Sequence, residues 1–271
     1  MEFIIKSGSP EKQRTACVVV GVFEPRKLTP AGEQIDHVSN GYLSDIIRRG
    51  DMEGKAGSIL LLHNVPNTLC DRVLLIGLGK EREFKDQEYC NAIATAVRTL
   101  NDTGSMEATS YLPELPARRR DIDWKIEQAV LSTLQALYRF DQLKSKPDEV
   151  RRPLRRMTLC VSRRNELAVA EKAVERGLAI SRAISLTKDL ANLPGNICTP
   201  TYLADKAKEM AKDKKLKLEI LEQADMEKLG MGALLSVARG SRQPPKLIVL
   251  HYKGGTAKQK PLVLIGKGIT F

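Results

Sequence analysis

The sequence predicts an α/β fold: an N-terminal α/β domain with a mostly parallel sheet, a connecting helix, and the truncated start of a second α/β domain. Short apolar runs alternate with amphipathic stretches from the start of the chain, and strands that alternate with helices at this spacing are typical of layered α/β domains. A long helical pattern followed by a Pro/Gly break separates the two parts. We place the N-terminal domain at 1–165, the connecting helix at 166–194 and the incomplete second domain at 195–271.

The strands of the N-terminal domain are predicted from apolar runs that are too short for helices. Their richness in Val, Ile and Leu is typical of strands buried on both faces of a sheet. The strongest runs are Thr15–Phe23, Ser58–His63 and Arg72–Ile76, and two weaker ones are Ala108–Leu112 and Met157–Val161. Helical patterns between these runs cover about 31–50, 87–101 and 121–143.

The connecting helix is predicted from apolar residues that recur at three- and four-residue steps from Glu166 to about Leu193. The sequence Asn192-Leu-Pro-Gly-Asn ends it. Thr199-Pro200 then begins another helix, with a hydroxyl N-cap and proline at the first position. Further strands are predicted at Leu216–Leu221, Lys246–Tyr252 and Pro261–Ile265.

Composition excludes several classes of protein. An apolar content of 42% argues against disorder, and the longest apolar run is far shorter than the roughly 20 residues of a membrane helix. Charged residues near Met1 interrupt the continuous apolar stretch that a signal peptide needs. The five scattered cysteines form no Cys-x-x-Cys pair and indicate reduced thiols. We therefore expect a cytoplasmic protein with no membrane partner.

The charge balance favours contact with polyanions. The chain has 44 Lys and Arg against 33 Asp and Glu, a net charge of +11. Two short segments hold much of this excess, and their arginines are Arg118, Arg119 and Arg120, then Arg151, Arg152, Arg155 and Arg156. One interpretation is solvated loops, and the other is contact with the phosphates of duplex DNA. Aromatic residues are not interleaved with these charges, which disfavours a platform for stacking single strands.

Two glycine-containing motifs follow predicted strands. Gly77-Leu-Gly79 lacks the third glycine of a dinucleotide-binding loop and predicts a tight turn. Lys267 lies between Gly266 and Gly268 but lacks the flanking residues of a phosphate-binding loop. A solvent-exposed turn residue is one interpretation of Lys267. A ligand-binding residue at the carboxyl end of a strand is the other.

Several segments together resemble the leucine aminopeptidase (cytosol aminopeptidase) family. Leu264-Ile-Gly-Lys-Gly-Ile-Thr-Phe271 is similar to the opening of its metal-binding segment, which continues in the family with Asp-Ser-Gly-Gly. The stretch 189–204 is similar to the entrance of the catalytic domain, and the stretches 3–14 and 100–106 resemble the bacterial aminopeptidase A branch. The resemblance covers the whole chain, but only about the first half of a family member.

The resemblance implies a hexameric enzyme, a dimer of trimers, that removes N-terminal residues, with leucine favoured, from peptides with a free N-terminus. It implies two divalent metal ions per subunit, manganese or zinc, with Lys267 as one ligand in its neutral form. The other ligands follow Phe271 in the family, so we expect the chain alone to be inactive. Some members of the bacterial branch also bind DNA, which makes an architectural or regulatory DNA-binding protein the alternative.

Overall fold

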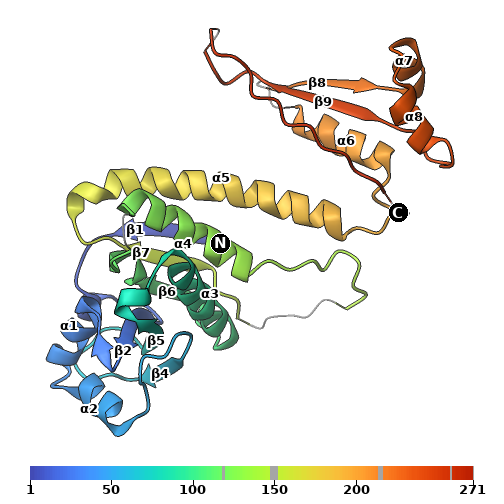
Figure 1. Ribbon diagram of the computed structural model, residues 1–271. Helices are drawn as coiled ribbons and strands as arrows, with labels where there is room; N and C mark the ends of the chain where they lie inside the picture. The colour runs from blue at the N-terminus through green and yellow to red at the C-terminus, as the bar shows by residue number, and fades with distance from the viewer. Residues whose placement is uncertain (118–119, 147–151, 213–215, 257, 271) are drawn as a thin grey trace. The chain divides into compact units, whose positions relative to one another are not determined.

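The structure is a computed structural model that describes residues 1–117, 120–146, 152–212, 216–256 and 258–270 (Figure 1). The chain forms two compact units, Met1–Leu186 and Thr187–Phe271. Within the described ranges, no helix has both the length and the apolar character that crossing a bilayer requires.

A seven-stranded sheet forms the centre of the first unit. Five of its strands are mutually parallel and lie in the order β1-β7-β6-β2-β5, while β4 pairs antiparallel with β5, and β3 pairs antiparallel with β2. The strands are β1 (Glu2–Lys6), β2 (Val18–Glu24), β3 (Lys27–Leu28), β4 (Ile59–His63), β5 (Arg72–Lys80), β6 (Glu107–Ser110) and β7 (Arg156–Cys160). The predicted α/β class with a mostly parallel sheet is confirmed.

Helices cover both faces of this sheet. They are α1 (Pro30–Val38), α2 (Tyr42–Arg49), α3 (Asp86–Asp102), α4 (Ile122–Ala136) and α5 (Leu167–Asn192), with 3-10 turns η1 (Pro10–Lys12), η2 (Glu81–Glu83), η3 (Leu112–Glu114) and η4 (Arg164–Glu166). Alternate residues of β2 point to opposite faces. Val19 packs in the core with α3, α4 and α5, whereas Val18 and Val20 pack in the core with α1 and α2. Figure 1 shows α4 beside α3 and α5.

Three elements of the first unit differ from the sequence predictions. The pattern at 31–50 forms two helices because Asn40 and Gly41 adopt left-handed backbone angles, with φ of 56° and 82°. The helix predicted at 121–143 ends at Ala136. The strand β4 lies at the sheet edge, where Ile59 is 48% exposed, so it is not buried on both faces.

Gly77 and Gly79 belong to a strand and do not form the predicted turn. The pairing of β2 with β5 shifts register between Val22 and Phe23, so Leu78 is an extra residue in β5, a β-bulge. Gly79 has φ of +75°. A Cβ on Gly77 would lie 2.0 Å from the carbonyl oxygen of Lys55. The two glycines therefore allow the bulge and the close approach of the preceding loop.

A close contact holds α5 against α4. Gly177 is buried in α5, and a Cβ there would lie 3.0 Å from the Cβ of Val130 on α4. One residue earlier, the Arg176 guanidinium donates hydrogen bonds of 2.6 Å to both Asp123 and Glu127. The missing side chain lets the helices approach, and Arg176, which bridges two carboxylates of α4, fixes how the two helices are aligned.

The second unit starts at Thr187, within α5, and its described residues form two strands where three were predicted. It holds α6 (Pro200–Met210), β8 (Leu216–Leu221), α7 (Gln223–Lys228), α8 (Gly232–Ala238) and β9 (Leu247–Tyr252). The Thr199 side chain accepts a hydrogen bond of 3.2 Å from the amide of Tyr202, which confirms the predicted N-cap of α6. The strands β8 and β9 pair antiparallel as a two-stranded sheet.

The strand predicted at Pro261–Ile265 is wrong. No strand is formed there, and Leu264 and Ile265 are 88% and 94% exposed. An apolar run becomes a buried strand only where neighbouring strands and covering helices remove it from water. In the described ranges, β8 and β9 pair only with each other. The run therefore keeps its apolar side chains in solvent.

Candidate functional site

Lys267 is the residue to which the sequence assigns metal binding. It is exposed and lies in a segment without regular secondary structure. The carboxyl end of a central strand, where the sequence would place it, is therefore not formed. In the described part of the chain, no three His, Cys, Asp or Glu side chains come together in a group that could hold a metal ion. The described residues therefore do not fit a pair of metal ions, because the single amine of Lys267 cannot replace the carboxylates that such a pair needs.

Arg120 is the one arginine of the first basic segment that the structure describes, since Arg118 and Arg119 lie outside the described residues. Its Nε donates to both carboxylate oxygens of Asp86, at 3.1 and 3.2 Å. Its guanidinium lies 4.7 Å from the ring centroid of Trp124. The hydrogen bond from Arg120 lowers the pKa of Asp86 below its usual range. Arg120 therefore connects the start of α3 to the start of α4.

The second basic segment is also only partly covered by the described residues. Arg151 lies outside the described residues. Arg156 forms ion pairs with Glu2 at 2.8 Å and Glu107 at 3.4 Å, across three neighbouring strands. Arg152 and Arg155 are exposed, and Arg155 is bound through its backbone, whose amide donates to the Met106 carbonyl at 2.8 Å. Of the described arginines predicted to contact DNA, Arg152 and Arg155 present their charge to solvent.

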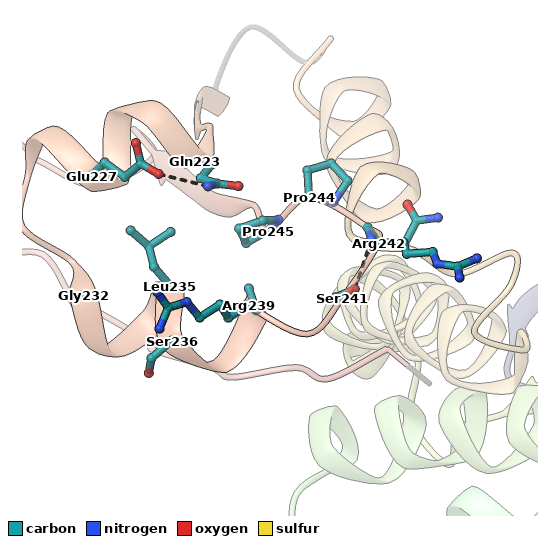
Figure 2. Close-up of a pocket in the computed structure, with 12 residues that line it drawn as sticks. Gln223, Glu227, Gly232, Leu235, Ser236, Arg239, Ser241, Arg242, Pro244 and Pro245 are labelled. Carbon is teal, nitrogen blue, oxygen red and sulfur yellow. Dashed lines mark hydrogen bonds between the residues drawn. The ribbon is translucent and has the colours of Figure 1, made fainter.

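A pocket of about 600 Å³ lies in the second unit. Figure 2 shows Gln223 and Glu227 of α7 on one side, Leu235 and Arg239 at α8 on the other, and Pro245 between them. The Gln223 amide donates to the Glu227 carboxylate at 2.9 Å. The twelve lining residues include no His, Cys, Asp or Lys, so they offer no pair of groups for general acid–base catalysis. This pocket contains none of the residues predicted from the sequence.

Another cluster of titratable side chains lies at the carboxyl ends of β6 and β7. Burial raises the pKa of Glu114 to about 6, although the charge of Lys125 opposes the change and that of Glu166 adds to it. Burial lowers the pKa of Lys125, whose ammonium donates to the Leu115 carbonyl at 3.1 Å. Burial also raises the pKa of the Cys160 thiol to about 12. Sequence patterns miss this cluster because its members come from separate segments.

Comparison with known protein families defines the class of this chain. Residues 19–147 match the N-terminal domain of the cytosol aminopeptidase family, and residues 185–271 match the catalytic domain of the same family. The two matches, in this order along an α/β chain, indicate part of a peptidase. The chain belongs to the cytosol aminopeptidase family, and the resemblance found in the sequence is confirmed.

Curated relatives agree with this membership. A protein of Dechloromonas aromatica (strain RCB) named "Probable cytosol aminopeptidase" is 63% identical over 271 residues. A protein of Thioalkalivibrio sulfidiphilus (strain HL-EbGR7) with the same name is 59% identical over 272 residues. Each alignment covers all of this chain but only 54% and 55% of the relative. The chain therefore spans about half the length of the curated relatives it matches.

Solved structures support the fold. A variant of tomato leucine aminopeptidase superimposes with a TM-score of 0.78 at 20% identity, covering 96% of this chain and 52% of that one. The bottromycin maturation enzyme BotP in complex with Mn gives a TM-score of 0.67 at 22% identity, covering 87% and 45%. At these identities the similarity establishes the fold alone.

Proposed function

We propose that this chain is the N-terminal portion of a cytoplasmic leucyl aminopeptidase, which removes N-terminal residues, leucine preferred, from peptides with a free N-terminus. The observation that carries the proposal is the order of the two family matches, N-terminal domain at 19–147 and catalytic domain at 185–271, in one chain. The relatives' printed name, cytosol aminopeptidase, supports both the activity and the cytoplasmic location.

The complete enzyme would use two divalent metal ions, manganese or zinc, with Lys267 as a ligand to one of them. The Mn named in the BotP complex supports divalent metal use in this fold. A lysine can coordinate a metal only through its neutral amine, which burial beside a dication favours. Because the described residues contain no group of three His, Cys, Asp or Glu side chains that could hold a metal ion, we expect residues 1–271 alone to hold no metal pair and to hydrolyse no leucyl substrate.

A chimera in which the remainder of the Dechloromonas aromatica relative follows residue 271 tests the role of Lys267. Lys267→Met should preserve folding, because the apolar stem is kept, but should reduce metal content and leucyl-amide hydrolysis severely. Lys267→Arg should be no better, since a guanidinium stays protonated. Lys260→Met, at an exposed lysine of the same segment, is the matched control and should keep both properties. Normal metal occupancy and turnover in Lys267→Met would remove Lys267 from the site.

Oligomeric state is a separate part of the proposal. We expect the complete protein to form a homo-hexamer, a dimer of trimers, as the family resemblance implies. Mass photometry of the same chimera measures this directly. A population that stays monomeric across the working concentration range would contradict the hexamer while leaving the aminopeptidase assignment intact.

A second candidate function is architectural or regulatory binding of duplex DNA. The observations that favour it are the net charge of +11 and the exposed side chains of Arg152 and Arg155. Phosphate contacts release counterions, so binding should weaken steeply with salt. Alanine at all seven arginines of the two basic segments should flatten the salt dependence. Alanine at Arg48 and Arg49, which are exposed on α2, is the control and should leave the salt dependence unchanged. If binding by the wild type and by the sevenfold variant had the same salt dependence, the seven arginines would be excluded from DNA contact.

A further inference from the structure

The pocket between α7 and α8 in the second unit has fixed walls. On one side, α7 is anchored by Met226, which is fully buried. An ion pair between Glu222 and Lys246 joins the residue before α7 to the residue before β9. The neighbouring strands pair at the same place, with Leu221 opposite Leu247. The start of α7 and the end of the loop before β9 are therefore held together.

The loop from α8 to β9 forms a second wall. The Ser241 amide donates to the Ala238 carbonyl, and the Gln243 amide donates to the Ser241 hydroxyl, each at 3.0 Å. Pro244 and Pro245 follow, and their rings fix the backbone φ angles. The pocket of about 600 Å³ is thus preformed, and its volume lies within the roughly 300–1,000 Å³ of small-molecule sites.

Two side chains of opposite charge line this pocket without meeting. Figure 2 shows Glu227 on α7 and Arg239 at the end of α8 on opposite sides. Among the described residues, neither side chain has an ion-pair partner. The Gln223 amide donates to Glu227 Oε1 at 2.9 Å, which orients the carboxylate but occupies only one of its oxygens. The pocket therefore presents an acceptor on one wall and a cationic donor on the other.

Apolar side chains lie between these charges. Leu235 is half-buried, and Figure 2 shows it pointing from α8 toward α7, with Pro245 beside the same space. A ligand that covers Leu235 and Pro245 removes apolar surface from water, which favours binding. A simple cation would leave Arg239 uncompensated, and a simple anion would leave Glu227 uncompensated. A ligand with an ammonium group at one end, a carboxylate at the other and an apolar middle satisfies all of these groups.

The length of the ligand follows from the separation of the charges. In a free amino acid, the ammonium and carboxylate groups are attached to the same carbon, so the molecule reaches across one residue only. A dipeptide extends this reach to roughly 7 Å, and a volume of about 600 Å³ has room for its two side chains. Because Glu227 and Arg239 do not meet across the pocket, the geometry favours the longer ligand.

We propose that this pocket binds short apolar peptides with both termini free, with the peptide ammonium at Glu227 and the peptide carboxylate at Arg239. Leu235 and Pro245 contact the apolar side chains of the peptide. This role goes beyond the proposed aminopeptidase activity, because it assigns peptide binding without cleavage to residues 223–245. Binding is weak, with a dissociation constant of roughly 1 mM, since both charged groups are exposed to solvent.

A titration of residues 1–271 with the dipeptide Leu-Leu tests the proposal. NMR spectra of the Leu235 methyl groups and the Ser236 amide report occupation of the pocket, because both residues line it. A chelator in the buffer ensures that no metal ion holds the peptide. We expect saturable shifts at both residues, and their absence up to about 10 mM Leu-Leu would overturn the proposal.

Modified peptides show which ends of the ligand are recognised. Leu-Leu-amide lacks the carboxylate, N-acetyl-Leu-Leu lacks the ammonium group, and free leucine is too short to reach both charges. Each should bind about 5- to 10-fold more weakly than Leu-Leu, which is the effect of losing one exposed, charge-assisted hydrogen bond. Equal binding of all four compounds would mean that apolar contact alone holds the peptide, and would overturn the assignment of the two charges.

Variants match each charge of the ligand with one of the protein. Arg239→Gln should abolish the difference in affinity between Leu-Leu and Leu-Leu-amide, while the difference between Leu-Leu and N-acetyl-Leu-Leu remains. Glu227→Gln should do the reverse. Lys228→Gln and Glu219→Gln, at exposed positions outside the pocket lining, are the matched controls and should bind as the wild type does. If both differences survive in Arg239→Gln and in Glu227→Gln, these residues do not hold the peptide, and the proposal is refuted.

Discussion

Replacing Gly177 by alanine tests the packing of α5 on α4. In an exposed helix this change stabilises by about 1 kcal/mol, because glycine is the poorer helix former. In this structure the added Cβ would lie 3.0 Å from the Cβ of Val130 and 3.3 Å from the Glu127 carbonyl oxygen. Overpacking of this kind costs about 1–3 kcal/mol. We therefore expect a net loss of about 1 kcal/mol, with the packing cost exceeding the helix propensity.

The assay uses urea denaturation monitored by tryptophan fluorescence. The chain has one tryptophan, Trp124, which lies on α4 and packs 5.8 Å from Tyr89, measured between ring centroids. Its emission therefore reports unfolding of the first unit. Ala179→Gly, at an exposed position of α5, measures the propensity difference within the same helix and serves as the control.

A double variant identifies the contact. Val130→Ala removes Cγ1, one of the two Val130 atoms that the new Cβ would meet, at 3.1 Å, so Gly177→Ala should be tolerated better in that background. We expect a coupling free energy of about 1–2 kcal/mol between the two changes. If Gly177→Ala instead stabilises the protein by the amount measured at Ala179, the close approach of the helices inferred here is refuted.

Three other predictions concern buried polar side chains. Thr133→Val should raise the free energy of unfolding by about 1 kcal/mol in urea denaturation, because the buried Thr133 hydroxyl has no hydrogen-bond partner among the described residues. Tyr89→Phe should lower it by about 1 kcal/mol by removing the hydrogen bond of 2.9 Å to the Lys125 carbonyl, and an unchanged midpoint would contradict this. Burial raises the pKa of Cys17 to about 12. In the native protein at mildly alkaline pH, the Cys17 thiol should therefore resist alkylation by iodoacetamide. Mass spectrometry that shows alkylation as fast as in urea would contradict its burial.

Elements encoded locally could be predicted from the sequence. The run that contains β2 is apolar without interruption, which is typical of a strand buried on both faces. Thr199 and Pro200 define the start of α6 through the side-chain hydroxyl and the proline ring. In both cases, the residues that determine the element lie within it.

Elements that depend on distant partners could not be predicted. Glu2–Lys6 is a strand because it pairs with β7, and Pro261–Ile265 is not, because the described residues offer it no neighbour. The candidate site residues also differ in whether the local sequence or the fold reveals them. Local glycines single out Lys267, but only the fold brings Glu114 to Lys125 and Glu166.

The position of β1 constrains the order in which the sheet can assemble. Glu2 lies opposite Arg156, 154 residues later in the chain, and their side chains form an ion pair. At a translation rate of about 5–20 residues per second, the ribosome completes β7 about 8–30 s after β1. During that interval the first strand has no edge to join, so this non-local pairing raises the contact order and delays closure. The nascent chain must therefore keep its amino-terminal strand unpaired until nearly the whole first unit has been synthesised.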